Sequence, residues 1–460
     1  MLFTSISLAF VQLIFIVSIA YLEYRRKSVS IFLWAMLFVL FGLMHFITVL
    51  SNSAKFPLWV YDNASLFVIC FCFIYLITRA VCPVYAIKFS KWSEISEHSF
   101  TCSEKRFIKV TVLILFITVA YRIHQMVNGV GGLLETSWSS GRDVGLESEY
   151  FNGGQIIICL YNYACSAILL SIFCKKRNQA IFCTFLIIAC VIITRNRVVV
   201  LPIMVSVIAY YLYNGTKMSL NKILALGTIG IMSVLAIYAL QIFRYYGNFI
   251  QFADQFELND FTNHIFQNMS EEKGDIGLRE VFYYFIYHNN QFENFGEGHT
   301  YIRMLLVFIP TSWSMGLKPP DFAISMGTAM GTGIEGFSTH PTLFGDCFAN
   351  FGYCGIFMGI FWALFVQVFD YMIYRQKHII KICLIVLCGN AYIIMGRGSI
   401  YNAFIWMLWG IILMFIIHYI SNSKIFSKNY ENRNACLRYT SRSDKNGSIG
   451  QGVSESSRSV

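Results

Sequence analysis

The stretch FTSISLAFVQLIFIVSIAYLEYRRK (3–27) decides the class of this protein, because an apolar run over 3–22 leads directly into three cations. A run of about 20 mostly apolar residues is long enough to cross the hydrocarbon core of a bilayer as an α-helix. Positive side chains next to such a run concentrate on the cytoplasmic side of the membrane. The stretch therefore predicts a membrane span with Arg25–Lys27 in the cytoplasm.

The composition extends this prediction to the whole chain of 460 residues. Hydrophobic residues make up 56% of the sequence and charged residues 13%, whereas soluble domains average about 25% charged residues. These values exclude an ordinary soluble enzyme, a disordered protein and a nucleic-acid-binding protein, despite the net charge of +10. The sequence predicts an all-α polytopic membrane protein.

Hydropathy divides the chain into four parts. We expect eight transmembrane helices in 1–242, a large outer loop over 243–342, three further spans in 343–420, and a disordered basic cytoplasmic tail over 421–460. Within the loop, LREVFYYFIYHN (278–289) is amphipathic, and YIRMLLVFIPTSW (301–313) is apolar but too short to span, so we expect interfacial or re-entrant helices there. The eleven expected spans are 3–22, 31–50, 64–85, 108–127, 154–173, 180–194, 198–213, 222–242, 343–368, 379–396 and 399–420.

The distribution of charge predicts the orientation of these spans. When Arg25–Lys27 are placed in the cytoplasm and the spans alternate, 24 of the 35 Lys and Arg residues lie on the inner side and 17 of the 25 Asp and Glu residues on the outer side. The spans 180–194 and 198–213 are short and could instead form one long helix. That alternative would place the basic tail outside, so the charge count favours a hairpin that turns at Arg195–Arg197.

The cations on the outer side are mostly arginines, with eight Arg against three Lys. A planar guanidinium matches the oxygens of phosphate and carboxylate groups, which indicates recognition of such anions. Arg195, Arg197, Arg244 and Arg397 stand where a span meets the outer face, a depth at which a charge is usually functional or paired. Snorkelling or pairing with the outer acids is the alternative. The eight are Arg122, Arg142, Arg195, Arg197, Arg244, Arg279, Arg303 and Arg397.

The segment FSTHPTLFGDCFANFGYCGIF (337–357) brings a second group of polar residues to the outer mouth of a span. His340 precedes the proline that begins the helix, and Asp346 and Asn350 share one helix face because they are four residues apart. A histidine is a plausible general base at neutral pH. A loop-capping role for His340 and a helix-capping role for Asp346 remain open.

Several motifs of other enzyme classes are missing from the sequence. It contains no GxxxxGK[ST], no HExxH and no GxSxG, which excludes P-loop ATPases, zincin-type metalloproteases and the usual serine hydrolases. Most cysteines lie in apolar runs without CxxC pairs, and therefore indicate neither a disulfide framework nor a zinc site. We expect no cofactor and no metal.

Five stretches in order carry a family resemblance: IITRNRVVVLP (192–202), QIFRYYGN (241–248), FIPTSW with KPP (308–320), HPTLFGDCFANFGYCG (340–355) and MGRGS (395–399). With a dominant outer loop before the last spans, the chain resembles bacterial O-antigen polymerases of the Wzy type over about 185–400. Many members of this family carry Glu where this chain has Asp346.

The resemblance implies a metal-independent glycosyltransferase in the bacterial inner membrane, with its active face in the periplasm. Its donor and acceptor would be undecaprenyl-diphosphate-linked glycans, and its partners a chain-length regulator and a flippase. His340, with Asp346 second, would take the proton of the acceptor hydroxyl. The residues that hold diphosphate would be Arg195, Arg197, Arg244, Arg279, Arg303 and Arg397. An O-antigen ligase and a lipid-linked oligosaccharide flippase or transporter are the alternative functions.

Overall fold

The structure is a computed structural model. It describes residues 2–87, 101–130, 152–194, 197–213, 276–293, 295–309, 313–331 and 339–423, with a few single positions between 228 and 263. Every regular element in these residues is helical, which confirms the all-α class. The expected span 222–242, the first part of the loop and nearly all of the tail lie outside the described residues.

The helices occur in the following order along the chain. They are α1 (Leu2–Arg26), α2 (Ile31–Leu37), the π-helix η1 (Phe38–Met44), α3 (His45–Leu50), α4 (Leu58–Val81), α5 (Cys102–Val130), α7 (Asn152–Ala164), α8 (Ala167–Phe173), α9 (Arg177–Thr194), the 3₁₀ helix η4 (Arg197–Val200), α10 (Leu201–Tyr213), η5 (Ile276–Arg279), α14 (Glu280–Tyr287), α15 (His299–Leu305), α16 (Phe322–Ala329), α17 (Thr342–Phe351), η7 (Gly352–Phe357), α18 (Met358–Arg375), α19 (His378–Arg397) and α20 (Ile400–Asn422).

Eight helical stretches of the described chain are long and apolar enough to cross a membrane, so the chain is a multi-pass membrane protein. Three of them are composite: α2, η1 and α3 run on as Ile31–Leu50, α7 and α8 as Ile156–Phe173, and α17, η7 and α18 as Thr342–Arg375. The expected spans 180–194 and 198–213 correspond to shorter apolar helices, Arg177–Ile193 and Val198–Tyr213. A total of eleven spans stays a prediction.

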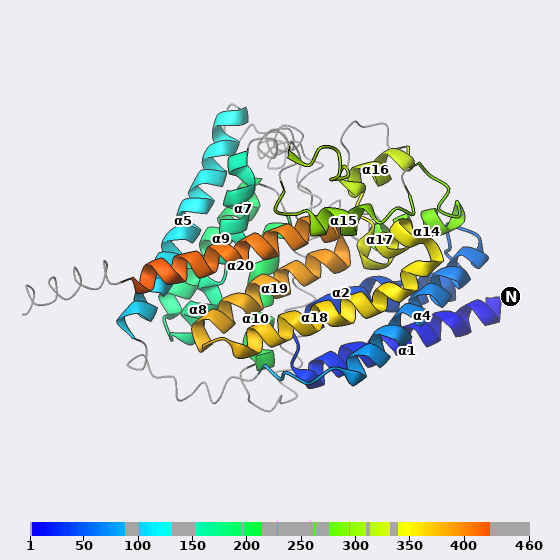
Figure 1. Cartoon of the computed structure of the whole chain (residues 1–460), viewed down its shortest axis with the longest axis horizontal. Helices are drawn as coiled ribbons and strands as arrows, with labels where there is room; N and C mark the ends of the chain where they lie inside the picture. Colours follow the sequence, from blue (N-terminus) through cyan, green and yellow to red (C-terminus); the bar gives the residue numbers. More distant parts are fainter. Residues whose placement is uncertain are drawn as a thin grey trace, which may run out of the picture.

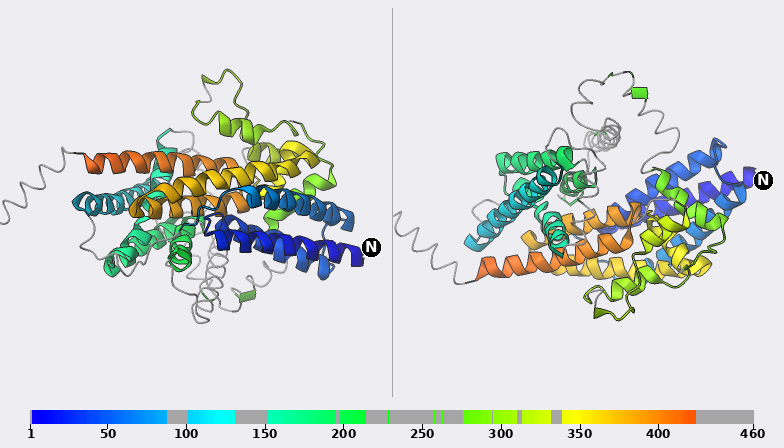
Figure 2. Two further views of the ribbon diagram at one scale, coloured as in Figure 1. Left: turned by 60° about the horizontal axis from the view of Figure 1, so that its bottom comes forward. Right: turned by 90° about the horizontal axis from the view of Figure 1, so that it is seen from above.

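The helix α19 is the centre of the bundle. Of the residues in its apolar segment, 94% are buried, because α19 packs against α2, α8, α10, α18 and α20. Figures 1 and 2 show α19 and α20 between one group of helices, formed by α1, α2, α4 and α18, and another formed by α5, α7, α8 and α9. A helix that is apolar on all sides is the type that a bundle buries completely.

Small residues allow the closest helix contacts in this bundle. A Cβ atom on Gly359 of α18 would lie 2.7 Å from the carbonyl oxygen of Phe71 on α4. A Cβ on Gly396 of α19 would lie 3.3 Å from the carbonyl oxygen of Leu33 on α2. Such contacts between backbones drive helix association where no water is available to be displaced.

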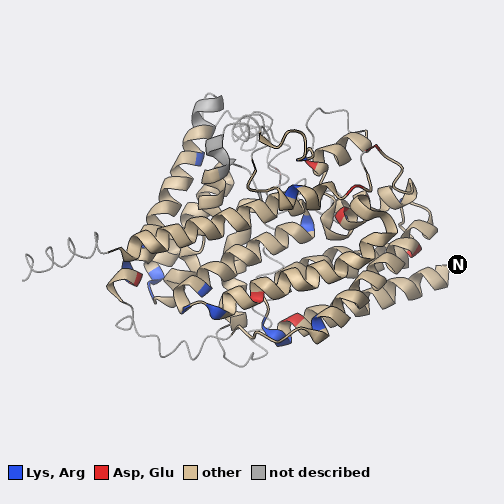
Figure 3. Cartoon of the chain, in the orientation of Figure 1, with Lys and Arg blue, Asp and Glu red and all other residues tan. Residues whose placement is uncertain are grey.

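The helix ends collect at two opposite ends of the bundle, as alternating spans require. One end, which we call the Arg79 end, brings together the C-terminal ends of α1, α4 and α10: Lys27 Nζ donates to the Leu212 carbonyl (3.1 Å) and Gln367 Nε2 to that of Pro83 (2.9 Å). At the opposite end, the Asp346 end, α15 packs on α20, α17 packs on α19 and α20, and α14 packs on α17, with α16 at the same end (Figure 1). In Figure 3 most of the Lys and Arg positions lie toward the first end, whereas the second end carries both acidic and basic positions.

Candidate functional site

The helix α17 carries a group of buried, hydrogen-bonded polar side chains at the Asp346 end. Asp346 and Asn350 are both buried, and Asn350 Nδ2 donates to Asp346 Oδ1 (3.0 Å) and to the Asp346 carbonyl (2.8 Å). The shared helix face that their spacing predicts is confirmed.

Thr300, at the start of α15, completes this group from the loop. Its Oγ1 donates to Asp346 Oδ2 (2.9 Å), and its backbone N–H donates to Asn350 Oδ1 (3.1 Å). Both oxygens of the Asp346 carboxylate therefore accept hydrogen bonds from neutral donors. The carboxylate holds the loop helix α15 against the span, and this arrangement favours a structural role for Asp346.

His340 lies at the junction of α16, α17 and the α19–α20 turn. The preceding Thr339 donates its N–H to the Ala323 carbonyl of α16 (2.9 Å). A Cβ atom on Gly398 would lie 3.6 Å from His340 Cγ, so the imidazole packs on the turn that follows Arg397. His340 is half-buried, in contrast to Asp346. Of the two expected general bases, His340 is the more accessible.

The backbone between these two residues is strained. Thr342 has a φ angle of 63° although it is β-branched, and it is fully buried. Its Oγ1 donates to the Pro341 carbonyl. A residue of this type in the left-handed region costs on the order of 1–3 kcal/mol, and such strain concentrates at functional sites.

Two of the expected diphosphate-binding arginines lie beside the turn between α19 and α20. Arg303 on α15 places its guanidinium carbon 4.6 Å from the ring centroid of Tyr401 and donates from Nη1 to the Pro319 carbonyl (2.6 Å). Arg397 ends α19, four residues before Tyr401. Both arginines are half-buried. Burial, and next the positive charge of Arg303, lower the pKa of the neighbouring Lys318.

Arg279 lies deeper than the sequence predicts. Its side chain is fully buried, and Nη2 donates to Thr48 Oγ1 (2.6 Å). Beside it, His45 pairs through Nδ1 with the Tyr283 hydroxyl (2.6 Å) and through Nε2 with Ser65 Oγ (2.9 Å). These contacts dock α14 onto α3 and α4. The burial of Arg279 favours a structural role rather than contact with a ligand.

The remaining expected arginines are not placed by the structure. Arg195 and Arg244 lie outside the described residues, and the side chain of Arg197 does as well. The convergence of Arg195, Arg197, Arg244 and Arg397 in one cavity stays a prediction.

A buried charge network that was not predicted from the sequence lies at the Arg79 end. Arg79 donates to Glu23 from Nε and from Nη2, at 2.7 Å each, and from Nη2 to Asp370 Oδ2 at 2.7 Å. Asp370 also accepts from Ser28 Oγ (2.8 Å) and Glu23 from the Tyr75 hydroxyl (3.0 Å). All three charged residues are almost completely buried. An acidic residue inside the apolar helix α18 was the signal that could have found it.

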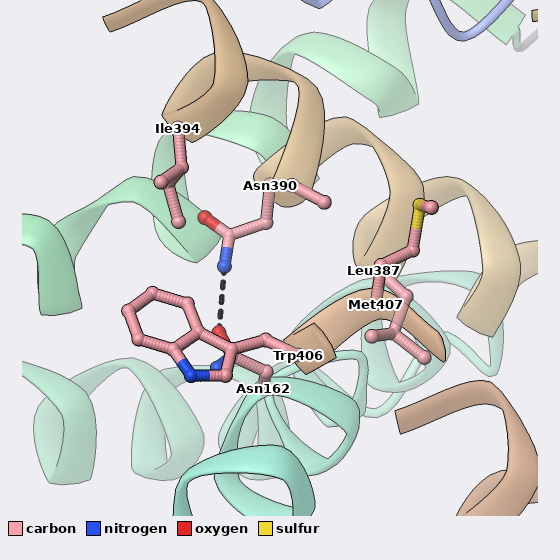
Figure 4. Close-up of a pocket in the computed structure, with 7 residues that line it drawn as sticks. Asn162, Leu387, Asn390, Ile394, Trp406 and Met407 are labelled. Carbon is pink, nitrogen blue, oxygen red and sulfur yellow. Dashed lines mark hydrogen bonds between the residues drawn. The ribbon is translucent and has the colours of Figure 1, made fainter. Parts of the chain in front are cut away.

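A second polar pair lies inside the bundle. Asn390 Nδ2 of α19 donates to Asn162 Oδ1 of α7 (2.7 Å) beside a small pocket that Trp406, Met407 and Leu387 also line (Figure 4). Asn390 lies seven residues before Arg397, and therefore about 10 Å from it along the axis of α19, toward the start of the helix. Interhelical hydrogen bonds of this kind contribute about 0.6 kcal/mol on average, so we interpret the pair as a helix contact.

The described residues contain no group of three or more His, Cys, Asp or Glu side chains that could hold a metal.

Replacing Thr300 with valine is expected to loosen α15 from α17 while keeping the side-chain shape. The change removes the donor to Asp346 and leaves one oxygen of a buried carboxylate without that partner, which costs about 1–3 kcal/mol. We expect a lower thermal unfolding temperature of the purified protein. The matched control is Thr328→Val, because the exposed Thr328 hydroxyl donates to a carbonyl of its own helix, that of Ile324. Equal unfolding temperatures for the two variants would contradict the tie between α15 and α17.

The chain was compared with models of protein families, with curated proteins and with solved structures, and none of the three comparisons gave a match.

Proposed function

We propose that this protein polymerises undecaprenyl-diphosphate-linked oligosaccharide repeat units, such as those of O-antigen, at the periplasmic face of the bacterial inner membrane. The observation that carries the proposal is the junction at the Asp346 end: Arg397 ends α19 just before the α19–α20 turn, His340 packs on that turn, and Arg303 stacks on Tyr401 just after it. These groups supply cations for a diphosphate and an accessible imidazole, at a helix end where a lipid-linked substrate presents its headgroup.

The chemistry assigns a role to each of these groups. Arg303 and Arg397 bind the diphosphate and stabilise the negative charge that develops as the glycan leaves its lipid carrier. His340 accepts the proton of the acceptor hydroxyl while the new glycosidic bond forms. Asp346 keeps α15, and with it Arg303, in place. The reaction in this form uses no metal and no nucleotide.

Two other functions share parts of this architecture. A ligase that transfers the finished glycan to a lipid acceptor would need the same cations and the same base. A lipid-linked oligosaccharide transporter is favoured by one observation, the buried network of Glu23, Arg79 and Asp370, because ionisable groups inside a membrane often line a transport path. That network lies at the ends of α1 and α4 rather than midway along them, and the polymerase is therefore our first choice.

The lipopolysaccharide pattern of a deletion strain separates the three functions. Loss of a polymerase leaves the lipid core with a single repeat unit. Loss of a ligase leaves bare core, with polymerised glycan still attached to its lipid carrier. Loss of a flippase also leaves bare core, with single repeat units trapped on the cytoplasmic side. A full ladder from the deletion strain would overturn all three.

A further inference from the structure

The segment that follows α15 exposes large apolar side chains in unusual density. Leu305 is 83% exposed, Trp313 77%, Met315 95% and Leu317 74%. Exposed apolar area costs about 25 cal/mol per Å² in water, and contiguous patches of this kind mark contact with a membrane or a partner. We call residues 305–309 and 313–317 the apolar loop.

The contacts of this loop set its depth relative to α20. Arg303, just before the loop, stacks on Tyr401 in the first turn of α20, and Phe308 packs on Trp409 with 5.8 Å between ring centroids. Tyr401 and Trp409 are eight residues apart, a rise of about 12 Å along the helix. Between Arg303 and Phe308 the chain therefore runs along α20, away from its start. Because α20 is long and apolar enough to cross a membrane, this direction leads into the bilayer.

Two cations tie the two arms of the apolar loop together. Arg303 Nη1 donates to the Pro319 carbonyl (2.6 Å), and Lys318 Nζ donates to the Ile309 carbonyl (2.9 Å), so each joins the outgoing and the returning chain. Inside the loop, Leu317 donates its N–H to the Ser314 carbonyl (2.8 Å). Arg303 at the base and the apolar side chains beyond it match the change from headgroups to hydrocarbon across a leaflet, while the long Lys318 side chain reaches from the base to the Ile309 carbonyl inside the loop.

The surface of α20 next to the loop indicates what covers it. Trp409 is 38% exposed, and Ile416 and Tyr419 further along α20 are exposed as well. These side chains belong to a helix that crosses the membrane, so they face lipid, and Phe308 continues the same surface. We infer that the apolar loop is a re-entrant element immersed in the leaflet beside α20, where membrane lipid packs against it and reaches Arg303 from the side. If the protein is the proposed polymerase, the isoprenoid chain of the lipid carrier enters along this loop, and this step alone rests on the proposed function.

Site-specific photo-crosslinking tests the immersion without any assay of activity. The photoreactive residue p-benzoylphenylalanine is placed at Met315 in the full chain, reconstituted in nanodiscs of phosphatidylethanolamine and phosphatidylglycerol. Ile416 serves as the lipid-facing reference, and Glu293, exposed in the polar connection between α14 and α15, as the control. Adducts with lipid are then measured by mass spectrometry. Met315 makes so little contact that its replacement leaves the fold intact, and a second probe at Leu305 repeats the measurement.

We expect a lipid-adduct yield at Met315 similar to that at Ile416 and about tenfold above that at Glu293, a preference that corresponds to about 1.4 kcal/mol. A yield at Met315 and Leu305 no higher than at Glu293, while Ile416 reacts, would overturn the inference. So would crosslinks between two copies of the chain in place of lipid adducts, because they would make the loop a protein interface. A deletion strain with a full ladder would remove the proposed polymerase but not the immersed loop.

Discussion

Replacing Arg79 with methionine is expected to prevent the protein from reaching a stable folded state. The guanidinium is 1% exposed and bridges two buried carboxylates, Glu23 and Asp370. Without it, two negative charges remain side by side in a site that water does not enter. Removal of one partner from a buried ion pair costs about 3–5 kcal/mol, a large part of the roughly 5–15 kcal/mol that stabilises a typical domain. The measurement is the yield of monodisperse protein in detergent and its thermal unfolding temperature.

Two controls separate this effect from a general loss of positive charge. Arg375→Met removes an exposed arginine at the end of α18, and we expect a nearly unchanged unfolding temperature. Asp370→Asn keeps an acceptor for Arg79 and removes the excess negative charge, since the network contains two carboxylates for one guanidinium. We expect the asparagine variant to fold. If Arg79→Met were as stable as Arg375→Met, the network would contribute nothing to the folded state.

Replacing His340 with alanine is expected to abolish polymerisation while the protein inserts at normal abundance. A sugar hydroxyl is a weak nucleophile, and a positioned general base contributes about 10²–10⁴-fold to a rate. His340 is half-buried on the Gly398 turn, so the substitution removes an accessible imidazole rather than a core residue. We expect core with a single repeat unit in place of a ladder when the variant is expressed in the deletion strain.

His299→Ala is the matched control for this prediction. The His299 ring pairs with Glu297 (2.8 Å) at the start of α15, on the same end of the bundle, and its loss is expected to leave the ladder intact. Asp346→Asn distinguishes the two candidate bases. A full ladder from His340→Ala together with a lost ladder from Asp346→Asn would assign the base to the carboxylate. Full ladders from both variants would mean that the reaction needs no dedicated base and that arginine-assisted departure of the diphosphate accounts for its rate.

Hydropathy was sufficient to predict the helical class and the approximate positions of the eight membrane-length helices of the described chain, because each is a local run of apolar residues. The same held for Asp346 and Asn350, whose contact follows from a spacing of four within one helix. Thr300, by contrast, is 46 residues from Asp346 and belongs to a loop without periodicity. Nothing in its local sequence indicates that its hydroxyl reaches a buried carboxylate.

The burial and the partners of Arg279 and Arg79 could not be predicted from the distribution of charge in the sequence. Arg279 is the second residue of the amphipathic stretch 278–289, but the pattern of LREVFYYFIY does not predict that the helix docks against α3 and α4 with the arginine buried beneath it. Arg79 was counted as one of the cations of the inner face, although its partner Asp370 is 291 residues away. Hydropathy also cannot locate the π-helix Phe38–Met44, because a wider helical turn contains the same kinds of residue.

That separation of 291 residues has a consequence for how the protein is made. Ribosomes add about 5–20 residues per second, so Arg79 and Glu23 have been synthesised roughly 15–60 s before Asp370 leaves the ribosome. α19, the helix around which the others pack, follows later still. The first spans must therefore wait in the bilayer with unfilled faces, and the nascent chain depends during this interval on the insertion machinery or on lipid to cover them. Assembly of the bundle is completed from the last quarter of the chain, and ribosome stalling before that point would leave an incomplete intermediate exposed to membrane proteases.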